Sequence, residues 1–94
     1  MIKTSLGKFT DFLEKHQSDG GFIGVIVSLP NQDQPELIIN VPESLATKIT
    51  YYKTAYNPDL TLKANHNVKI ISYNWVFDFD MLEQIYRKYL EENK

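Results

Sequence analysis

The chain has 94 residues, with ten basic and twelve acidic side chains and a net charge of −2 at pH 7. This length predicts one globular domain over residues 1–94, and the apolar fraction of 43% favours a packed core over disorder. Cysteine is absent, which excludes disulfides and thiolate–metal sites, and the near-neutral charge argues against nucleic-acid binding by charge alone.

The N-terminal residues have no apolar stretch of the kind found in a signal peptide, and no stretch approaches the ~20 residues that span a bilayer. We therefore expect a cytoplasmic protein with no membrane partner. Residues with AT-rich codons (Lys, Asn, Ile and Tyr) are frequent, which suggests a bacterial or phage gene, such as one from a mobile element.

The first predicted element is a helix, because apolar side chains recur at helical spacing from Leu6 to His16. Thr4 or Ser5 can cap its start, and the glycine pair at 20–21 can end it, since glycine adopts the left-handed conformation that closes many helices.

A hairpin is predicted next. Residues 22–29 predict a strand that is apolar on both faces, which is typical of a strand inside a sheet with cover on both sides. Residues 30–35 have the composition of a turn, and residues 36–41 predict an antiparallel partner strand. Because both faces of the first strand need cover, either helices cover both sides of the sheet or a second copy covers one, as in a homodimer.

The middle of the chain is ambiguous. Apolar residues at i, i+4, i+7 and i+11 predict a helix over residues 43–56, although its threonines and tyrosines favour a strand, which stays the alternative. Residues 60–64 and 68–76 predict the third and fourth strands, joined by an asparagine-rich turn at 65–67. The two halves of the fourth strand present apolar side chains on opposite faces, and a bulge near Ser72 would reconcile them.

The last predicted element is a helix with the clearest apolar stripe. Asp80 with Glu83 fits a capping box at its start, and Asp78 is a rival cap. The stripe consists of Leu82, Ile85, Tyr86, Tyr89 and Leu90. The order α-β-β-α-β-β-α predicts the α+β class, with a four-stranded, mainly antiparallel sheet and three helices.

The sequence contains no set of residues that is typical of an enzyme. Asp78, Asp80 and Glu83 could ligate Mg²⁺ or Ca²⁺, but helix capping and the helix dipole explain acidic residues at a helix start. Nothing brings His16 and His66 together, and no Gly-x-Ser-x-Gly is present. The glycines before the first strand lack the lysine and the strand–loop–helix order of a P-loop. We therefore expect no catalytic residue, no metal site and no cofactor.

Binding candidates come from an aromatic stripe. Tyr73, Trp75 and Phe77 alternate along one face of the fourth strand, with Lys69 on the same face by parity and Lys63 across the hairpin. Aromatic side chains near lysines can stack single-stranded bases. The same stripe can instead pack under a helix or form a protein interface.

Tyr51 is a further binding candidate, because it lies off the apolar stripe of its predicted helix. The leading hypothesis is a non-enzymatic module for protein interaction or regulation. One alternative is a nucleic-acid-binding module that uses the aromatic face. Another is a small enzyme with an unrecognised site, in which His16 or His66 would have to meet a carboxylate inside a pocket.

Overall fold

The computed structural model of the chain describes residues 3–93. Its elements are α1 (Ser5–Lys15), β1 (Phe22–Ser28), β2 (Glu36–Asn40), the 3₁₀ turn η1 (Pro42–Ser44), α2 (Leu45–Ala55), β3 (Thr61–Leu62), β4 (Asn65–Val76) and α3 (Asp80–Glu92). The predicted class and order of elements are therefore confirmed.

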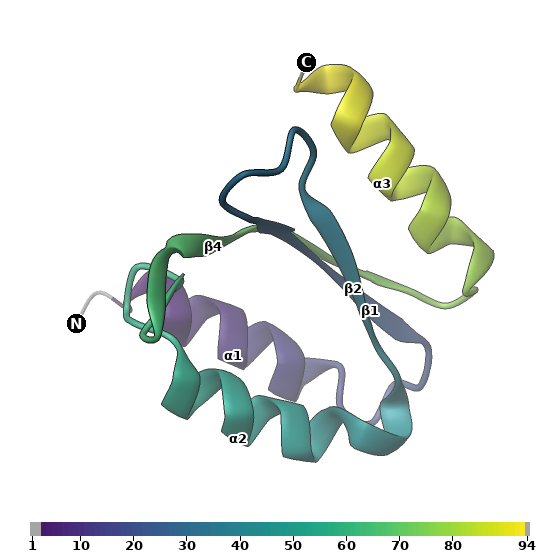
Figure 1. Cartoon of the computed structure of the whole chain (residues 1–94). Helices are drawn as coiled ribbons and strands as arrows, with labels where there is room; N and C mark the ends of the chain where they lie inside the picture. Colours follow the sequence, from purple (N-terminus) through teal and green to yellow (C-terminus); the bar gives the residue numbers. More distant parts are fainter. Residues whose placement is uncertain (1–2, 94) are drawn as a thin grey trace.

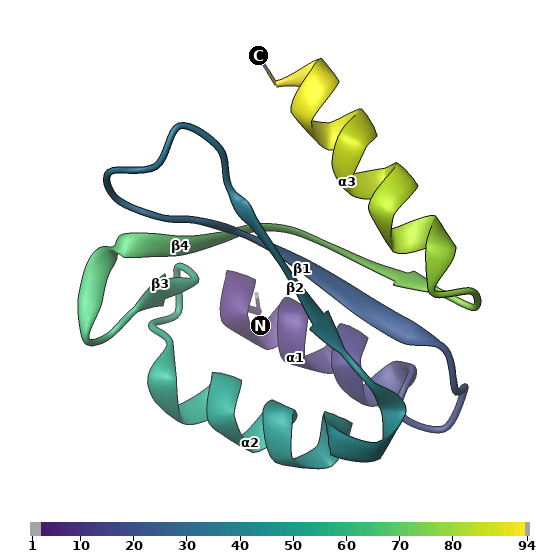
Figure 2. The same ribbon diagram turned by 45° about the vertical axis from the view of Figure 1, so that its right-hand side comes forward.

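The four strands form one sheet in the order β2-β1-β4-β3, and every neighbouring pair is antiparallel. Helices α1 and α2 lie side by side on one face of this sheet, while α3 lies on the other (Figures 1 and 2). The chain's own helices thus cover both faces of β1. The sequence allowed cover by helices on both sides of the sheet or by a second copy on one side, and the structure shows helices on both sides.

The main core lies between the sheet and the α1/α2 layer. Ile23, Val25 and Val27 of β1 point into it, and its other fully buried side chains come mostly from the two helices. These others are Phe9, Leu13, Leu45, Ile49, Tyr52, Tyr56 and Ile70.

A buried polar pair lies within this core. The Asn40 side chain is 2% exposed; its Nδ2 donates to the Ile23 carbonyl at 3.2 Å, and its Oδ1 accepts from the Tyr52 hydroxyl at 3.3 Å. Burial raises the pKa of Tyr52 above its ordinary value, and burial raises the pKa of the neighbouring Tyr56 to about 12. Both phenols are therefore neutral partners in the core at physiological pH.

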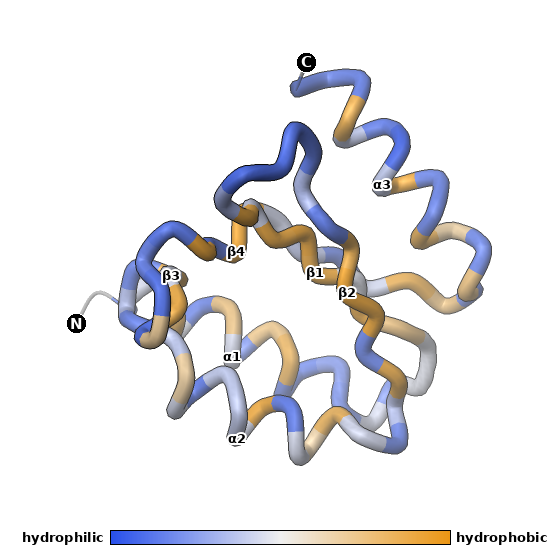
Figure 3. The backbone as a smooth tube through the Cα atoms, in the orientation of Figure 1, coloured by the Kyte–Doolittle hydropathy of each residue, from blue (hydrophilic) through white to orange (hydrophobic). Residues whose placement is uncertain are grey.

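The α3 face is more sparsely packed. Leu82 is the one buried side chain that α3 contributes, and it lies directly on Gly24, where an added Cβ would be only 2.7 Å from Leu82 Cδ2. The Tyr86 hydroxyl donates to the Pro35 carbonyl and ties the helix to the β1–β2 loop. The colouring in Figure 3 shows hydrophobic positions alternating with hydrophilic ones along α3. A glycine in β1 thus lets α3 approach the sheet closely at one point.

The region that was ambiguous in the sequence is helical, so the strand alternative for residues 43–56 is wrong. Burial decides the outcome: Leu45, Ile49 and Tyr52 all point into the core, and only helical spacing places them on one face. Local strand propensity is weaker than this burial.

The β3–β4 hairpin is tighter than predicted. Its turn is Lys63–Ala64, because Leu62 pairs with Asn65, so the expected turn at 65–67 belongs to β4. Leu60 has a φ of 72°, which is not a strand conformation, and β3 therefore begins only at Thr61.

The sequence predicted the N-cap of α1 correctly but not that of α3. Thr4 caps α1, since its Oγ1 accepts from the Gly7 N–H at 3.0 Å. The predicted capping box of α3 is wrong: Phe79 is the N-cap and no side chain caps it, although Asp78 accepts from the Asp80 N–H at 3.3 Å.

The predicted bulge is confirmed. Ile26 of β1 lies opposite Ser72, while the next residue, Val27, lies opposite Ile70, so Ile71 is the extra residue. Within residues 3–93, no helix is long and apolar enough to cross a membrane.

Candidate functional site

The first two aromatic residues of the predicted stripe lie over α1. The Tyr73 ring packs against Phe9 and Phe12, with centroid distances of 4.8 and 5.0 Å. The Trp75 ring stacks on His16 at 5.0 Å, with the planes 10° apart, and its Nε1 donates to a backbone carbonyl in the turn before β1 at 2.9 Å. Both rings are half-buried, so this part of the stripe fixes α1 beneath β4.

The third aromatic residue is different, because it lies among exposed apolar residues at one end of the sheet. Phe77 lies just past the end of β4 and is 74% exposed, while Phe79 just before α3 and Met81 in its first turn are 50% and 47% exposed. Phe79 meets Phe22 edge-on at 5.3 Å, and Phe77 lies 6.3 Å from Trp75. We call these five residues the aromatic end. The two pairs lie on opposite faces of the sheet, since Trp75 faces α1 whereas Phe22 shares the face of Gly24 and α3. Exposed apolar side chains around the end of a sheet typically mark an interaction surface.

The predicted lysines do not join these aromatics. Lys69 lies opposite Ser28 and so shares a face with Gly24, not with Tyr73; the parity expectation is wrong because the bulge changes the faces. Lys63 lies in the β3–β4 turn, and at about 3.3 Å per residue it is roughly 30 Å from Trp75 along the strand. Within residues 3–93, Lys63 and Lys69 therefore do not form a basic and aromatic patch with this stripe.

Tyr51 forms a separate site on α2. Its ring is 45% exposed, as predicted, and it contacts Tyr52 at 5.4 Å, with the Lys48 ammonium 5.8 Å from its centroid. It lies on a different element from the aromatic end, and the contacts of the two sets do not overlap.

Sequence reasoning missed an open edge along β4. The short strand β3 pairs with β4 only at Asn65 and Lys69, and the Ile70 N–H donates to the Leu60 carbonyl at 3.0 Å. Over residues 71–76, the part of the chain that the structure describes places no strand on that side of β4. The edge is open because β3 has only two residues. Strand β3 is short because the positive φ of Leu60 is not a strand conformation.

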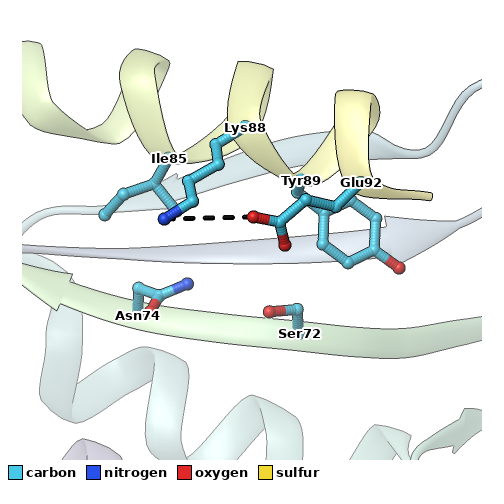
Figure 4. A pocket seen from close by; sticks show the side chains of 6 residues that line it. All are labelled: Ser72, Asn74, Ile85, Lys88, Tyr89 and Glu92. Carbon is cyan, nitrogen blue, oxygen red and sulfur yellow. Dashed lines mark ion pairs between the residues drawn. The ribbon is translucent and has the colours of Figure 1, made fainter. Parts of the chain in front are cut away.

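A polar cavity of about 300 Å³ lies beside this edge, between β4 and α3. Figure 4 shows Ser72 and Asn74 of β4 facing Lys88 and Glu92 of α3, with Ile85 and Tyr89 completing the lining. The Lys88 ammonium and the Glu92 carboxylate are 3.9 Å apart. The sequence does contain a signal for this cavity, since Ser72 and Asn74 are polar residues at alternate positions of an otherwise apolar strand.

Neither histidine lines the cavity beneath α3. His16 Nδ1 lies 2.9 Å from Asp19 Oδ2, but neither the cavity beneath α3 nor the smaller one beside the β1–β2 loop is lined by a histidine. His66 is exposed on β4. Among residues 3–93, no three His, Asp or Glu side chains are grouped so that they could hold a metal ion.

Comparison of the chain with models of known protein families, with curated protein sequences and with solved structures gave no significant match.

Proposed function

We propose that this chain is a protein-interaction domain that binds another protein through its aromatic end. The exposure of Phe77, Phe79 and Met81 carries the proposal, because these residues follow one another at one end of the sheet. Phe77 lies beside Trp75 on the α1 face, and Phe79 lies beside Phe22 on the α3 face. Aromatic side chains and methionine are enriched at the centres of protein interfaces, and the rigid aromatic rings bury large areas with little loss of side-chain entropy.

The charge distribution favours a protein partner over nucleic acid. The net charge is −2, and the two lysines nearest the stripe in sequence lie on the other face of β4 or at its far end. Binding to nucleic acid would need cations that contact phosphates near the aromatic rings.

A different protein, rather than a second copy, is the partner that we propose. The homodimer hypothesis rested on the need to cover both faces of β1, and α3 supplies the cover on the second face. Ile26 and Leu82 are both buried on this side of β1.

The test compares capture by the wild-type chain with capture by a double variant, F77S/F79S, from a nuclease-treated bacterial lysate. Tyr51→Ser is the matched control, because it also removes an exposed aromatic ring. A protein retained by the wild type and by the control, but weakened about 30-fold or more in the double variant, supports the proposal. Equal retention by the double variant contradicts it. Retention from an untreated lysate that is lost after nuclease treatment would instead favour the nucleic-acid alternative.

A further inference from the structure

The helices on the two faces of the sheet are attached to it very differently. Helices α1 and α2 each bury three side chains, which are Phe9, Thr10, Leu13, Leu45, Ile49 and Tyr52. Helix α3 is longer, at 13 residues against 11 in each of the others, but Leu82 is its one buried side chain. The rest of its apolar stripe is half-buried. Less burial therefore holds α3 to the sheet than holds α1 and α2.

Polar contacts add one further point of attachment. Within residues 3–93, the side-chain hydrogen bond that joins α3 to another element is the one from the Tyr86 hydroxyl to the Pro35 carbonyl. The ion pairs of α3 join residues four apart within the helix, so they do not bind it to the sheet. Leu82 on Gly24 and Tyr86 on the β1–β2 loop are therefore the two main attachments of the helix.

Cavities flank the C-terminal half of α3 on the side of β4 and on the side of the β1–β2 loop. The polar cavity of about 300 Å³ lies between the helix and β4 (Figure 4), and a second cavity of about 220 Å³ lies between its last residues and the loop. Polar cavities of this size admit water. This half of the helix thus lacks the close packing that holds α1 and α2.

The segment between β4 and α3 has the properties of a hinge. Residues 77–79 are exposed, and no side chain caps the helix start at Phe79. Phe79 is 50% exposed, so its edge-on contact with Phe22 buries little. The end of β4 is anchored, because Val76 is buried and Trp75 donates to a backbone carbonyl before β1. Changes in the backbone angles of 77–79 would therefore move α3 without disturbing the sheet.

We propose that α3 is a lid that opens as one unit about residues 77–79 while the sheet and the α1/α2 layer stay folded. An isolated helix of 13 residues is marginal in water, so the opened lid loses its helical hydrogen bonds. Opening uncovers Ile26 and Leu37, which lie beside Gly24 beneath the helix and share its face with Phe22. This motion needs no partner, so it goes beyond the proposed interaction function and does not rest on it.

Native-state amide exchange of the full chain, measured at increasing low concentrations of urea, tests the lid. The hydrogen-bonded amides of α3 should share one urea dependence, smaller than that of β1, and should exchange about 100-fold or more faster than the amides of β1. Equal rates and equal urea dependence in α3 and β1 would overturn the lid, because α3 would then open only with the whole domain. Rates that rise steadily towards the last turn of α3 would also overturn it, because they indicate fraying.

Two tyrosines of α3 provide a matched pair of variants for this exchange measurement. Tyr86→Phe removes the hydroxyl that binds the Pro35 carbonyl, so it should speed the exchange of the α3 amides about threefold to tenfold. Tyr89→Phe removes the hydroxyl of a half-buried ring that lines both cavities and donates no hydrogen bond within residues 3–93. This control should change the exchange less than about twofold. Equal effects of the two variants would contradict an attachment of the lid through Tyr86.

The absence of cysteine permits a chemical test on the sheet itself. Ile26→Cys places one thiol beneath α3, and the matched variant Val25→Cys places one beneath the α1/α2 layer; Ile26 and Val25 are 1% and 0% exposed. At equal stability in urea titrations, a thiol reagent should label the first variant about tenfold or more faster than the second, because opening of α3 uncovers only the first. Equal labelling rates would overturn the lid.

Neither of these readouts depends on the capture experiment with F77S/F79S. Failure of that capture would overturn the proposed function and leave the exchange and labelling results standing.

Discussion

Replacing Leu82 by alanine should loosen α3 from the sheet. Leu82 is 1% exposed and is the buried contact between α3 and β1, so the change should lower the free energy of unfolding by about 2–4 kcal/mol. The value should lie below the top of the usual range, because α3 is otherwise held by half-buried side chains and can partly collapse into the space. Met81→Ala is the matched control, since Met81 is 47% exposed and the loss there should stay below about 0.5 kcal/mol.

A double-mutant cycle makes this reasoning sharper. Gly24→Ala alone should cost about 1–2 kcal/mol, because its Cβ would lie 2.7 Å from Leu82 Cδ2 and 3.1 Å from Leu37 Cδ1. In the Leu82→Ala background the same methyl group should enter the space that the leucine leaves. The double variant should therefore be more stable than the sum of the single effects by at least about 1 kcal/mol.

Urea unfolding gives the free energies for this cycle, and amide exchange shows where the structure opens. The amides of α3 should lose protection in Leu82→Ala, while those of β1 should lose less. Additive effects of the two substitutions, or unchanged protection of α3, would refute the view that Leu82 on Gly24 holds this helix.

Three further predictions concern the core and the turn before β1. Tyr52→Phe should lower the free energy of unfolding by about 1–2 kcal/mol in urea titrations, because the buried Asn40 side-chain oxygen loses its donor. The pKa of Tyr56 is raised to about 12, so above about pH 10 the native state keeps a proton that the unfolded chain loses. The contribution of this phenol to stability should be constant below pH 10 and fall above it, and Tyr56→Phe should lessen that fall in denaturation curves measured against pH. Gly21→Ala should lower the thermal midpoint more than Gly20→Ala. Both glycines have positive φ, but only at Gly21 would the new Cβ meet a backbone oxygen, at 2.5 Å.

The strands and helices could be predicted because most of them carry a strong local pattern. The doubly apolar run of β1 indicated a central strand, and its five middle residues are buried. Spacing and composition disagreed over α2, and the spacing of Leu45, Ile49 and Tyr52 was the better guide, because burying three large side chains stabilises more than strand propensity costs.

The site was harder to predict, because it depends on register and on strand length. The face of the sheet on which Lys69 lies depends on which residue of β4 is the extra one. A sequence can suggest that a strand has a bulge, but it rarely shows which residue is bulged and so which side chains lie on each face. The open edge follows from the positive φ of Leu60, which no residue preference signals. The exposure of Phe77 depends on where β4 ends, and such boundaries are the least certain part of a sequence prediction.

The extra residue in β4 lets one strand present apolar side chains on opposite faces in its two halves. Ile71 is 38% exposed, so other side chains should be accepted there. Removing Ile71 would leave Ile70 opposite Val27 and Ser72 opposite Ile26 as neighbouring pairs of a regular ladder, so the side chains on either side should keep their faces. The loss should instead remove the local bend and added twist that a bulge gives to a strand, and so change the curvature of β4 more than the composition of its two faces.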